Sequence, residues 1–444
     1  MTYCSLLPAA AAMLLSAGSA LAQSAFRILS PIGTDTSVSI RSVSPDGTTV
    51  LGSSGASNLD AATWSTANGA GTRRALSPAV AGRPYTQAVA ASTSASVLGL
   101  NVLNGSFNPV PYRVQGASRL AIPTLPGATF AYTEGVSASG DVFAGWSDRT
   151  GGTQTMWRWS AATGTQAVPI PAGYSTANSG LQVTRCLSGD GNVVIGYVAA
   201  GDSRAFSFNA ATGVLTLLPL LPNTAPGLNQ ANSISFDGSV IVGEASADVG
   251  GALDSVAVRW TSSGAEQLIP GSAGLGWRAR IVSGDGRTII GKRLSSGSPS
   301  NFIWRDGVVG SIESLMTELG LSTSGLTDID PKDVSFDGTV IVGRVRANGL
   351  SRGFALVIPP IPAVCLADLA GGTDIGLPAG GQDGSVDGTD FIAFINSFAI
   401  GSVAVDPTAD VAGGTNTGRP AGGPDGTIDG TDFIAFINAF AAGC

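Results

Sequence analysis

The sequence predicts an all-β, seven-bladed β-propeller followed by a small α-helical module. Three observations support this prediction. A unit that begins with Ser-x-Asp-Gly recurs seven times, at intervals of about 50 residues. Each unit carries four short strand-like segments, the number found in one propeller blade. The chain then changes character, because its last 81 residues contain a tandem duplication that is rich in Asp.

Composition and charge divide the chain in the same way. The 444 residues include 62 Gly and carry a net charge of −8. Residues 364–444 hold ten Asp and a single basic residue, Arg419, so the remainder is nearly neutral. This distribution argues against a basic nucleic-acid-binding surface. No apolar run after the N-terminus is long enough to predict a membrane span.

The N-terminus is typical of a secretory signal peptide. An apolar stretch from Leu6 to Leu15 precedes the small-residue cleavage pattern Ala20-Leu21-Ala22. We therefore expect a protein that is secreted or displayed on the cell surface. The predicted divisions are a signal peptide (1–22), a seven-repeat propeller (23–358), a Pro-rich linker (359–364) and a duplicated module (365–444).

The start of each repeat predicts a two-stranded hairpin. Asp-Gly between two apolar runs favours a tight turn, and we expect type I′ because Gly and Asp tolerate a positive φ. Each clear copy runs from its Ser to a closing Gly: Ser44 to Gly52, Ser188 to Gly196, Ser235 to Gly243, Ser283 to Gly291 and Ser335 to Gly343. Two worn copies run from Ser92 to Gly99 and from Ser137 to Gly145.

Two further strands are predicted in each repeat. The third carries large residues two apart, which share one face of a strand and would pack on the neighbouring blade. Examples are Trp157 and Trp159, Phe206 and Phe208, Val258 and Trp260, Phe302 and Trp304, and Phe354 and Leu356. Because most Trp recur at such positions, we interpret them as packing residues. The fourth strand is expected in segments rich in Leu, Ile and Pro, at 167–170, 215–218 and 267–270.

The two ends of the repeat region predict how the ring closes. Residues 26–31 look like a fourth strand without the first three. The last repeat ends after its third strand, at residues 354–357, and lacks a fourth. We expect residues 26–31 to pair beside residues 353–357, because this pairing would complete the last blade and remove two sheet edges.

The repeats resemble extracellular HAF-type repeats across about residues 26–357. The Ser-x-Asp-Gly half matches well, whereas Arg204-Ala205-Phe206 is the nearest remnant of the His-Ala-Phe half, since the chain has no His. The resemblance implies a secreted repeat protein and no particular activity.

The duplicated tail is typical of calcium binding. Residues 383–396 recur as residues 425–438, and both copies have the Asp spacing of an EF-hand-like loop. The predicted ligands are Asp383, Asp387 and Asp390 in the first copy and Asp425, Asp429 and Asp432 in the second. A helix should begin near Thr389 with Phe391, Phe394, Ile395 and Phe398 on one face, and again with Phe433, Phe436, Ile437 and Phe440. The alternative is an Asp-rich linker of Asx turns.

This pattern resembles a GC-type dockerin, a type I-like module that binds two calcium ions and a cohesin domain on a partner protein. The resemblance implies Asp368 and Asp410 as first ligands, with Asp374 and Asn416 as candidate third ligands. Both copies depart from the family through an eleven-residue Gly-rich insertion, so incomplete coordination is an alternative. Thr389 and Thr431 match positions that contribute to partner choice. The bracketing Cys365 and Cys444 match the family's termini, and we expect them to form a disulfide, in preference to a pairing with Cys186.

The chain lacks every His, which excludes Ser-His-Asp, Cys-His and His-metal chemistry. No carboxylate pair stands out, and no Arg cluster is apparent in register on a propeller face. One repeat position, directly after the closing Gly, varies as a ligand-facing site would, and Trp146 and Tyr197 there could stack on a glycan. The predicted ligand-binding residues are Trp146, Tyr197, Glu244, Lys292 and Arg344. We therefore predict a non-catalytic binding propeller; the alternative is an extracellular polysaccharide hydrolase or lyase.

Overall fold

The computed structural model describes most of the repeat region and part of the tail. It covers residues 24–360, except 56–58, 74–85, 105, 107, 149–153, 176–184, 223, 250, 270–275 and 295–299, and in the tail residues 388–402, 409, 428 and 430–442. The chain forms two compact units, Met1–Ile361 and Pro362–Cys444. The predicted signal peptide lies outside the described residues. Within the described part of the chain, no helix has both the length and the apolar character of a membrane span.

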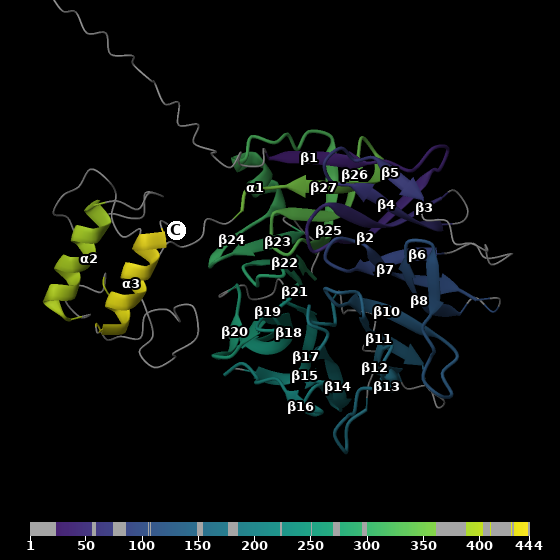
Figure 1. Ribbon diagram of the computed structural model, residues 1–444, viewed down its shortest axis with the longest axis horizontal. Helices are drawn as coiled ribbons and strands as arrows, with labels where there is room; N and C mark the ends of the chain where they lie inside the picture. Colours follow the sequence, from purple (N-terminus) through teal and green to yellow (C-terminus); the bar gives the residue numbers. More distant parts are fainter. Residues whose placement is uncertain are drawn as a thin grey trace, which may run out of the picture. The chain divides into compact units, whose positions relative to one another are not determined.

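The first unit is a seven-bladed β-propeller, as predicted. The described strands form seven antiparallel sheets, six with four strands and one with three. Figure 1 shows these sheets arranged around a common centre, with the first strand of each four-stranded blade on the inside. Sequence order follows the ring, because each blade is built from consecutive strands except where the chain ends meet.

The strands of blades one to three are β2 (Ser37–Val43), β3 (Thr49–Gly55), β4 (Leu59–Ser65), β5 (Gly71–Arg73), β6 (Thr86–Ala91), β7 (Val97–Leu103), β8 (Pro109–Gln115), β9 (Ser118–Ala121), β10 (Ala131–Val136), β11 (Val142–Asp148), β12 (Gln154–Ser160) and β13 (Gly164–Ala167). Blades four and five contain β14 (Val193–Ala200), β15 (Asp202–Asn209), β16 (Val214–Leu217), β17 (Thr224–Ile234), β18 (Ile241–Val249), β19 (Ala252–Thr261) and β20 (Gly264–Gln267). Blades six and seven contain β21 (Trp277–Val282), β22 (Thr288–Arg293), β23 (Asn301–Arg305), β24 (Val308–Gly310), β25 (Leu326–Val334), β26 (Val340–Ala347), β27 (Leu350–Val357) and β1 (Ala25–Leu29).

The N-terminal strand closes the ring, which confirms the prediction. β1 is the outer strand of blade seven and pairs antiparallel with β27, with Ala25 opposite Val357 and Leu29 opposite Gly353. Leu29 is fully buried and packs in one cluster with Val38 and Trp64 of blade one. The closing strand therefore also joins blade seven to blade one.

The Ser-x-Asp-Gly turns have a different geometry from the one predicted. In blade five the amide of Gly238 donates to the carbonyl oxygen of Ser235, and Gly238 has a φ of +77°, whereas Asp237 does not have a positive φ. The turn is thus a four-residue loop with Gly in the last position, and the expectation of type I′ was wrong. The Asp237 carboxylate accepts hydrogen bonds from the Ser235 hydroxyl, at 2.6 Å, and from the Ser239 amide, at 2.9 Å. These two bonds explain why Asp occurs at the third position of the turn.

Backbone hydrogen bonds between these turns run from blade to blade and close on themselves. Each turn donates one amide to the carbonyl of the variable second residue of the next turn, over distances of 2.6–3.1 Å. The seven donor–acceptor pairs are Asp46 to Thr93, Thr93 to Ala138, Ala138 to Gly189, Gly189 to Phe236, Phe236 to Gly284, Asp285 to Phe336 and Phe336 to Pro45. We call this ring the turn belt. It surrounds one mouth of the central channel and ties all seven blades together.

The third strands pack as predicted, while two of the three predicted fourth strands are displaced. All seven Trp are buried, including Trp157, Trp159 and Trp260 on third strands. β16 covers residues 215–217 of its predicted segment, whereas β13 and β20 end at the first residue of theirs, so the remaining Ile and Pro residues follow the strand. A short helix that the sequence did not indicate, α1 (Ile312–Glu318), follows β24 and begins at a capping box centred on Ser311.

A β-bulge interrupts the inner strand of six blades, three residues before the Ser of the turn. A bulge inserts one unpaired residue and re-aims its side chain. The register shifts identify Arg41, Val89, Glu134, Asn232, Arg280 and Lys332 as the inserted residues, and Arg185 occupies the same sequence position in blade four. We call these seven the bulge residues.

The closing Gly is a consequence of the bulge in five repeats, whereas Gly99 and Gly196 lie against side chains only. A Cβ atom at Gly145 would overlap the carbonyl oxygen of Tyr132 on the bulged strand, and one at Gly243 would overlap that of Gln230. Only glycine allows the inner and second strands to approach this closely. The repeated Gly therefore marks the bulge, although the sequence alone did not reveal why.

Two bulge residues form ties across the channel. Arg185 of blade four donates to the carbonyl oxygens of Val282 in blade six and Val334 in blade seven, and pairs with Asp333 at 2.9 Å. Arg41 of blade one pairs with Glu134 of blade three at 3.5 Å. Burial raises the pKa of Glu134 from its ordinary 4.5 to about 7, even though Arg41 opposes the shift.

The second unit contains two described helices, α2 (Gly388–Ile400) and α3 (Gly430–Ala442), which start where the sequence predicts. Phe394 and Phe436 are fully buried and stack face to face, with ring centroids 4.0 Å apart. Phe391 was expected on the buried face, but its side chain is 38% exposed. Its ring contacts the ring of Phe440 in α3 at a tilted angle and is not covered by it.

The raised pKa of Glu134 predicts a pH-dependent stability. The folded protein keeps this proton up to about pH 7, whereas the unfolded chain releases it near pH 4.5. The stabilisation is therefore complete below about pH 4.5 and is lost as the pH rises to 7. We expect the free energy of unfolding of the parent, relative to Glu134→Gln, to fall by roughly 3 kcal/mol across this range.

Urea unfolding followed by tryptophan fluorescence measures this difference, because all seven Trp lie in the propeller. Glu318→Gln, which changes an exposed carboxylate, is the matched control and should give a difference that does not vary over the same pH range. A pH-independent difference between the parent and Glu134→Gln would contradict the assigned protonation.

Candidate functional site

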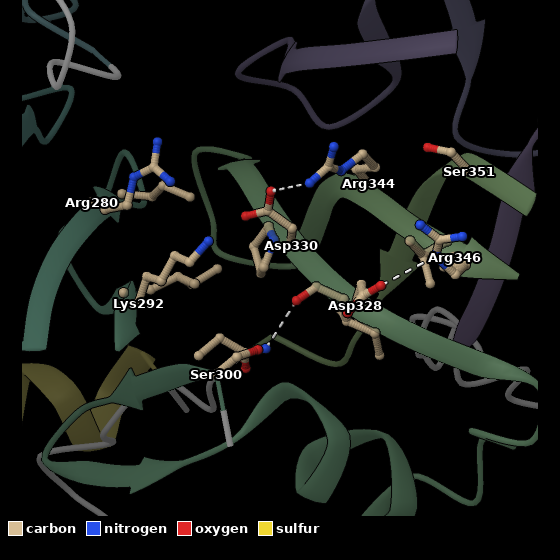
Figure 2. Close-up of a pocket in the computed structure, with 15 residues that line it drawn as sticks. Arg280, Lys292, Ser300, Asp328, Asp330, Arg344, Arg346 and Ser351 are labelled. Atoms are coloured by element: carbon tan, nitrogen blue, oxygen red, sulfur yellow. Dashed lines mark hydrogen bonds and ion pairs between the residues drawn. The ribbon is translucent and has the colours of Figure 1, made fainter. Parts of the chain in front are cut away.

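A pocket of about 240 Å³ opens between blades six and seven. Its walls come from β21, β22, β25, β26 and β27. Arg346 and Ser351 line it beside the β26–β27 connection, which is at the opposite end of these strands from the turn belt. The pocket therefore lies on the face of the propeller away from the belt, which we call the open face. Figure 2 shows its charged side chains converging from both blades.

Two carboxylates of β25 in this pocket are held by neighbouring cations. Asp330 pairs with Lys332 at 2.7 Å and with Arg344 at 3.5 Å, and Asp328 pairs with Arg346 at 3.3 Å. Burial would raise the pKa of Asp330, but Lys332, with Lys292 and Arg280, outweighs burial and lowers it. Asp330 is therefore an ionised acceptor at neutral pH.

Asp328 reaches the pocket through an unusual backbone conformation. Its φ is +53°, in the left-handed region, and it lies at a register shift between Thr327 and Asp330. Asp tolerates this region better than most residues because its short side chain can bond locally. The irregular backbone turns Asp328 toward Arg346 on the next strand (Figure 2).

Two cations in the pocket lack a carboxylate partner among the described residues. Neither Arg280 nor Lys292 forms an ion pair within 4.0 Å in this part of the chain. Burial lowers the pKa of Arg280, and the nearby cations Arg278 and Arg41 lower it further, although Asp330 opposes them. Lys292 lies directly opposite Arg278 across the β21–β22 pair. Positive charge thus accumulates on the blade-six side of the pocket.

The predicted ligand-binding residues divide into two groups. Lys292 and Arg344 line the open-face pocket. Trp146 and Tyr197 are each only 5% exposed, and Trp146 stacks on Tyr132 at a centroid distance of 4.6 Å, so the structure does not offer these rings to a glycan. Glu244 is fully buried and pairs with Arg278 at 2.8 Å. The residue directly after the closing Gly therefore differs between these blades because its contact differs: Trp146 stacks on Tyr132, whereas Glu244 pairs with Arg278.

Sequence reasoning missed half of the cationic cluster. The pocket gathers Arg280, Lys292, Arg344 and Arg346, so an Arg cluster does exist on a propeller face, contrary to the expectation from register. The cluster combines different repeat positions: Arg280 is a bulge residue, whereas Lys292 and Arg344 follow the closing Gly. The signal that could have revealed Arg280 is the residue three places before each Ser-x-Asp-Gly, which is charged in five of the seven repeats.

The structure describes only two of the predicted calcium ligands. Asp390 and Asp432 lie in the first turns of α2 and α3 and are fully buried. The remaining candidates lie outside the described residues: Asp368, Asp374, Asp383, Asp387, Asp410, Asn416, Asp425 and Asp429. The described residues alone contain no cluster of three metal-binding side chains. Thr389 and Thr431 fall in the first turns of the helices, but their side chains are not described.

The predicted disulfide also falls outside the described residues, since neither Cys365 nor Cys444 is described. Cys186 is a free thiol, fully buried in blade four, and burial raises its pKa. It lies next to Arg185, which bridges to Ser233 in blade five. Cys186 is therefore a packing residue of the inner strand.

No protein-family model and no curated protein matches the chain. Solved structures with a similar fold include the β-propeller domain of the Trilobed protease from Pyrococcus furiosus, with an open velcro topology (TM-score 0.48, 10% identity, 73% of this chain and 96% of that one). An oligogalacturonate lyase in complex with manganese has a TM-score of 0.48 at 11% identity, over 76% of this chain and 96% of that one. TolB from Acinetobacter baumannii has a TM-score of 0.39 at 11% identity over 71% of this chain, which spans 65% of that protein. These similarities concern the fold and assign no activity.

Proposed function

We propose that the protein is a secreted, non-catalytic propeller that binds an extracellular ligand in its open-face pocket. We further propose that its C-terminal module attaches it, through calcium, to a cohesin-type partner. The observation that supports the binding role is the convergence of charged side chains from two blades on one concave site, the usual form of a ligand pocket. Its 240 Å³ is below the range of drug-sized sites and suits one small unit of a larger ligand.

The protonation of the carboxylates favours binding over catalysis. A glycosidase needs one carboxyl group protonated and another ionised, on either side of the scissile bond. Asp330 is held ionised by its cationic neighbours. Glu134 has a pKa suited to an acid, but the cavity it lines is only about 30 Å³, close to the space of one water molecule. The pocket and the acid are therefore separate.

Charge balance in the tail supports the calcium proposal. Ten Asp and one Arg occupy residues 364–444, so protein cations cannot neutralise the carboxylates. Asp390 and Asp432 are fully buried at equivalent positions of two helices. If calcium binds, the loops before α2 and α3 would supply the remaining oxygen ligands.

Blocking the pocket tests the binding role. Ser351 is exposed at the edge of the pocket, so Ser351→Trp should fill it without changing any charge. We expect the mature protein to retain polysaccharide ligands on a glycan array without turning them over, and Ser351→Trp to lose at least about tenfold in affinity. Ser324→Trp, at an exposed position outside the pocket lining, is the control.

Unchanged array binding by Ser351→Trp would place the ligand elsewhere and contradict the proposed site. Release of reducing ends from any bound glycan would instead favour the alternative of a polysaccharide-active enzyme.

Calcium titration tests the proposed attachment module. Calorimetry on the full mature chain should detect about two bound Ca²⁺, and Asp390→Asn and Asp432→Asn should each remove one. Asp306→Asn changes a carboxylate of the propeller that pairs with Arg287 and should leave both sites intact. If no heat of binding is detected at millimolar Ca²⁺, the calcium proposal is wrong.

A further inference from the structure

We infer that Arg280 and Lys292 together bind an oxyanion on a sugar residue, either a carboxylate or a sulfate. This inference rests on the proposed function, because it names the ligand class of the same open-face pocket. The first observation is the position of Arg280. Its bulge places it on the pocket wall beside Ile281, and its Nε atom is buried without a hydrogen-bond acceptor in the described structure. A buried N–H group without an acceptor is costly, and a bound anion would supply one.

The second observation is the grouping of like charges around Arg280. Besides burial, Arg278 and Arg41 lower the pKa of Arg280, although Asp330 and Glu244 raise it, and Lys292 lies opposite Arg278 on the adjacent strand. The carboxylate of Glu244 pairs with Arg278, at 2.8 Å, rather than with Arg280 or Lys292. Like charges directly opposite each other on a sheet are destabilising, so this arrangement favours a ligand that carries the missing negative charge.

The acceptors in the pocket identify the rest of the ligand. Asp328 and Asp330 each engage cations through Oδ2. An ionised carboxylate has about four acceptor sites, so capacity remains for hydroxyl groups of a ligand. A molecule that places an oxyanion near Arg280 and hydroxyl groups near these two aspartates is a sugar acid or a sulfated sugar.

The lining also explains why the anion is needed. It contains no Trp, Tyr or Phe among its described residues, so a sugar ring would find no aromatic face to stack on. The apolar part of the wall comes from aliphatic residues such as Ile281, Ile290 and Val345. Charge-assisted hydrogen bonds must then supply most of the affinity.

The test is calorimetry of the full mature protein with three monosaccharides: glucuronate, glucose 6-sulfate and glucose. We expect at least one of the two charged sugars to bind and glucose to bind at least about tenfold more weakly. Arg280→Gln and Lys292→Gln should each weaken binding of the charged sugar at least about tenfold. Arg287→Gln is the matched control, because Arg287 lies in the same blade at the turn-belt end and pairs with Asp306.

The two charged probes identify the source of the oxyanion, and the glutamine variants test the site. Equal binding of glucose and both charged sugars, or charged-sugar binding that Arg280→Gln and Lys292→Gln leave unchanged, would overturn the inference. If Ser351→Trp abolishes glycan binding while the two glutamine variants keep it, the oxyanion site is wrong and the pocket remains the binding site. If none of these variants affects binding, both proposals fail.

Discussion

The turn belt is the constraint on which the rest of the propeller depends. Seven turns, five with Ser-x-Asp-Gly and two worn copies, share one internal hydrogen bond, and each donates a backbone hydrogen bond to the next until Phe336 returns to Pro45. A closed ring of this kind fixes the distance between neighbouring inner strands. It also fixes the position of the bulge three residues earlier and, through the bulge, the need for the closing Gly. The repeated Ser, Asp and Gly residues of the sequence thus all support the turn belt and the strand pairing next to it.

The turn belt is made of backbone hydrogen bonds, so it does not constrain which side chain occupies the bulge position. The charged side chains at this position therefore make different contacts in different blades. Arg185 donates hydrogen bonds to backbone carbonyl oxygens of blades six and seven, and Arg41 of blade one pairs with Glu134 of blade three. These contacts join blades that are not neighbours in the ring. Arg280 occupies the same repeat position but faces a pocket instead of a partner. One scaffold position therefore stabilises the ring in some blades and lines the proposed ligand pocket in another.

Much of the fold could be predicted from the sequence because repetition amplifies weak signals. Seven copies of one hairpin motif and the offset of the chain ends were enough to place β1 beside β27. The turn type was wrong, because Asp-Gly alone does not reveal that Gly ends a four-residue loop. The fourth strands predicted at 167–170 and 267–270 were placed too late, because their apolar and Pro residues lie in the connection that follows the strand, whereas the one predicted at 215–218 coincides with β16.

The site was less predictable because it depends on contacts between blades. Lys292 and Arg344 were found from their variation within the repeat, yet Trp146 and Glu244 share that position and are buried by partners specific to their blades. Arg280 was missed because the prediction did not consider the position three residues before each turn, although that position is charged in five of the seven repeats. Calcium binding remains a proposal for the tail.

A crystal structure of the mature protein with bound glucuronate would test the central claim most directly. The account predicts electron density for the carboxylate between the Arg280 guanidinium and the Lys292 ammonium group, within hydrogen-bond distance of both, with sugar hydroxyls directed at Asp328 and Asp330. Density elsewhere on the propeller, or an ion pair between Arg280 and a protein carboxylate that fills the site, would contradict it.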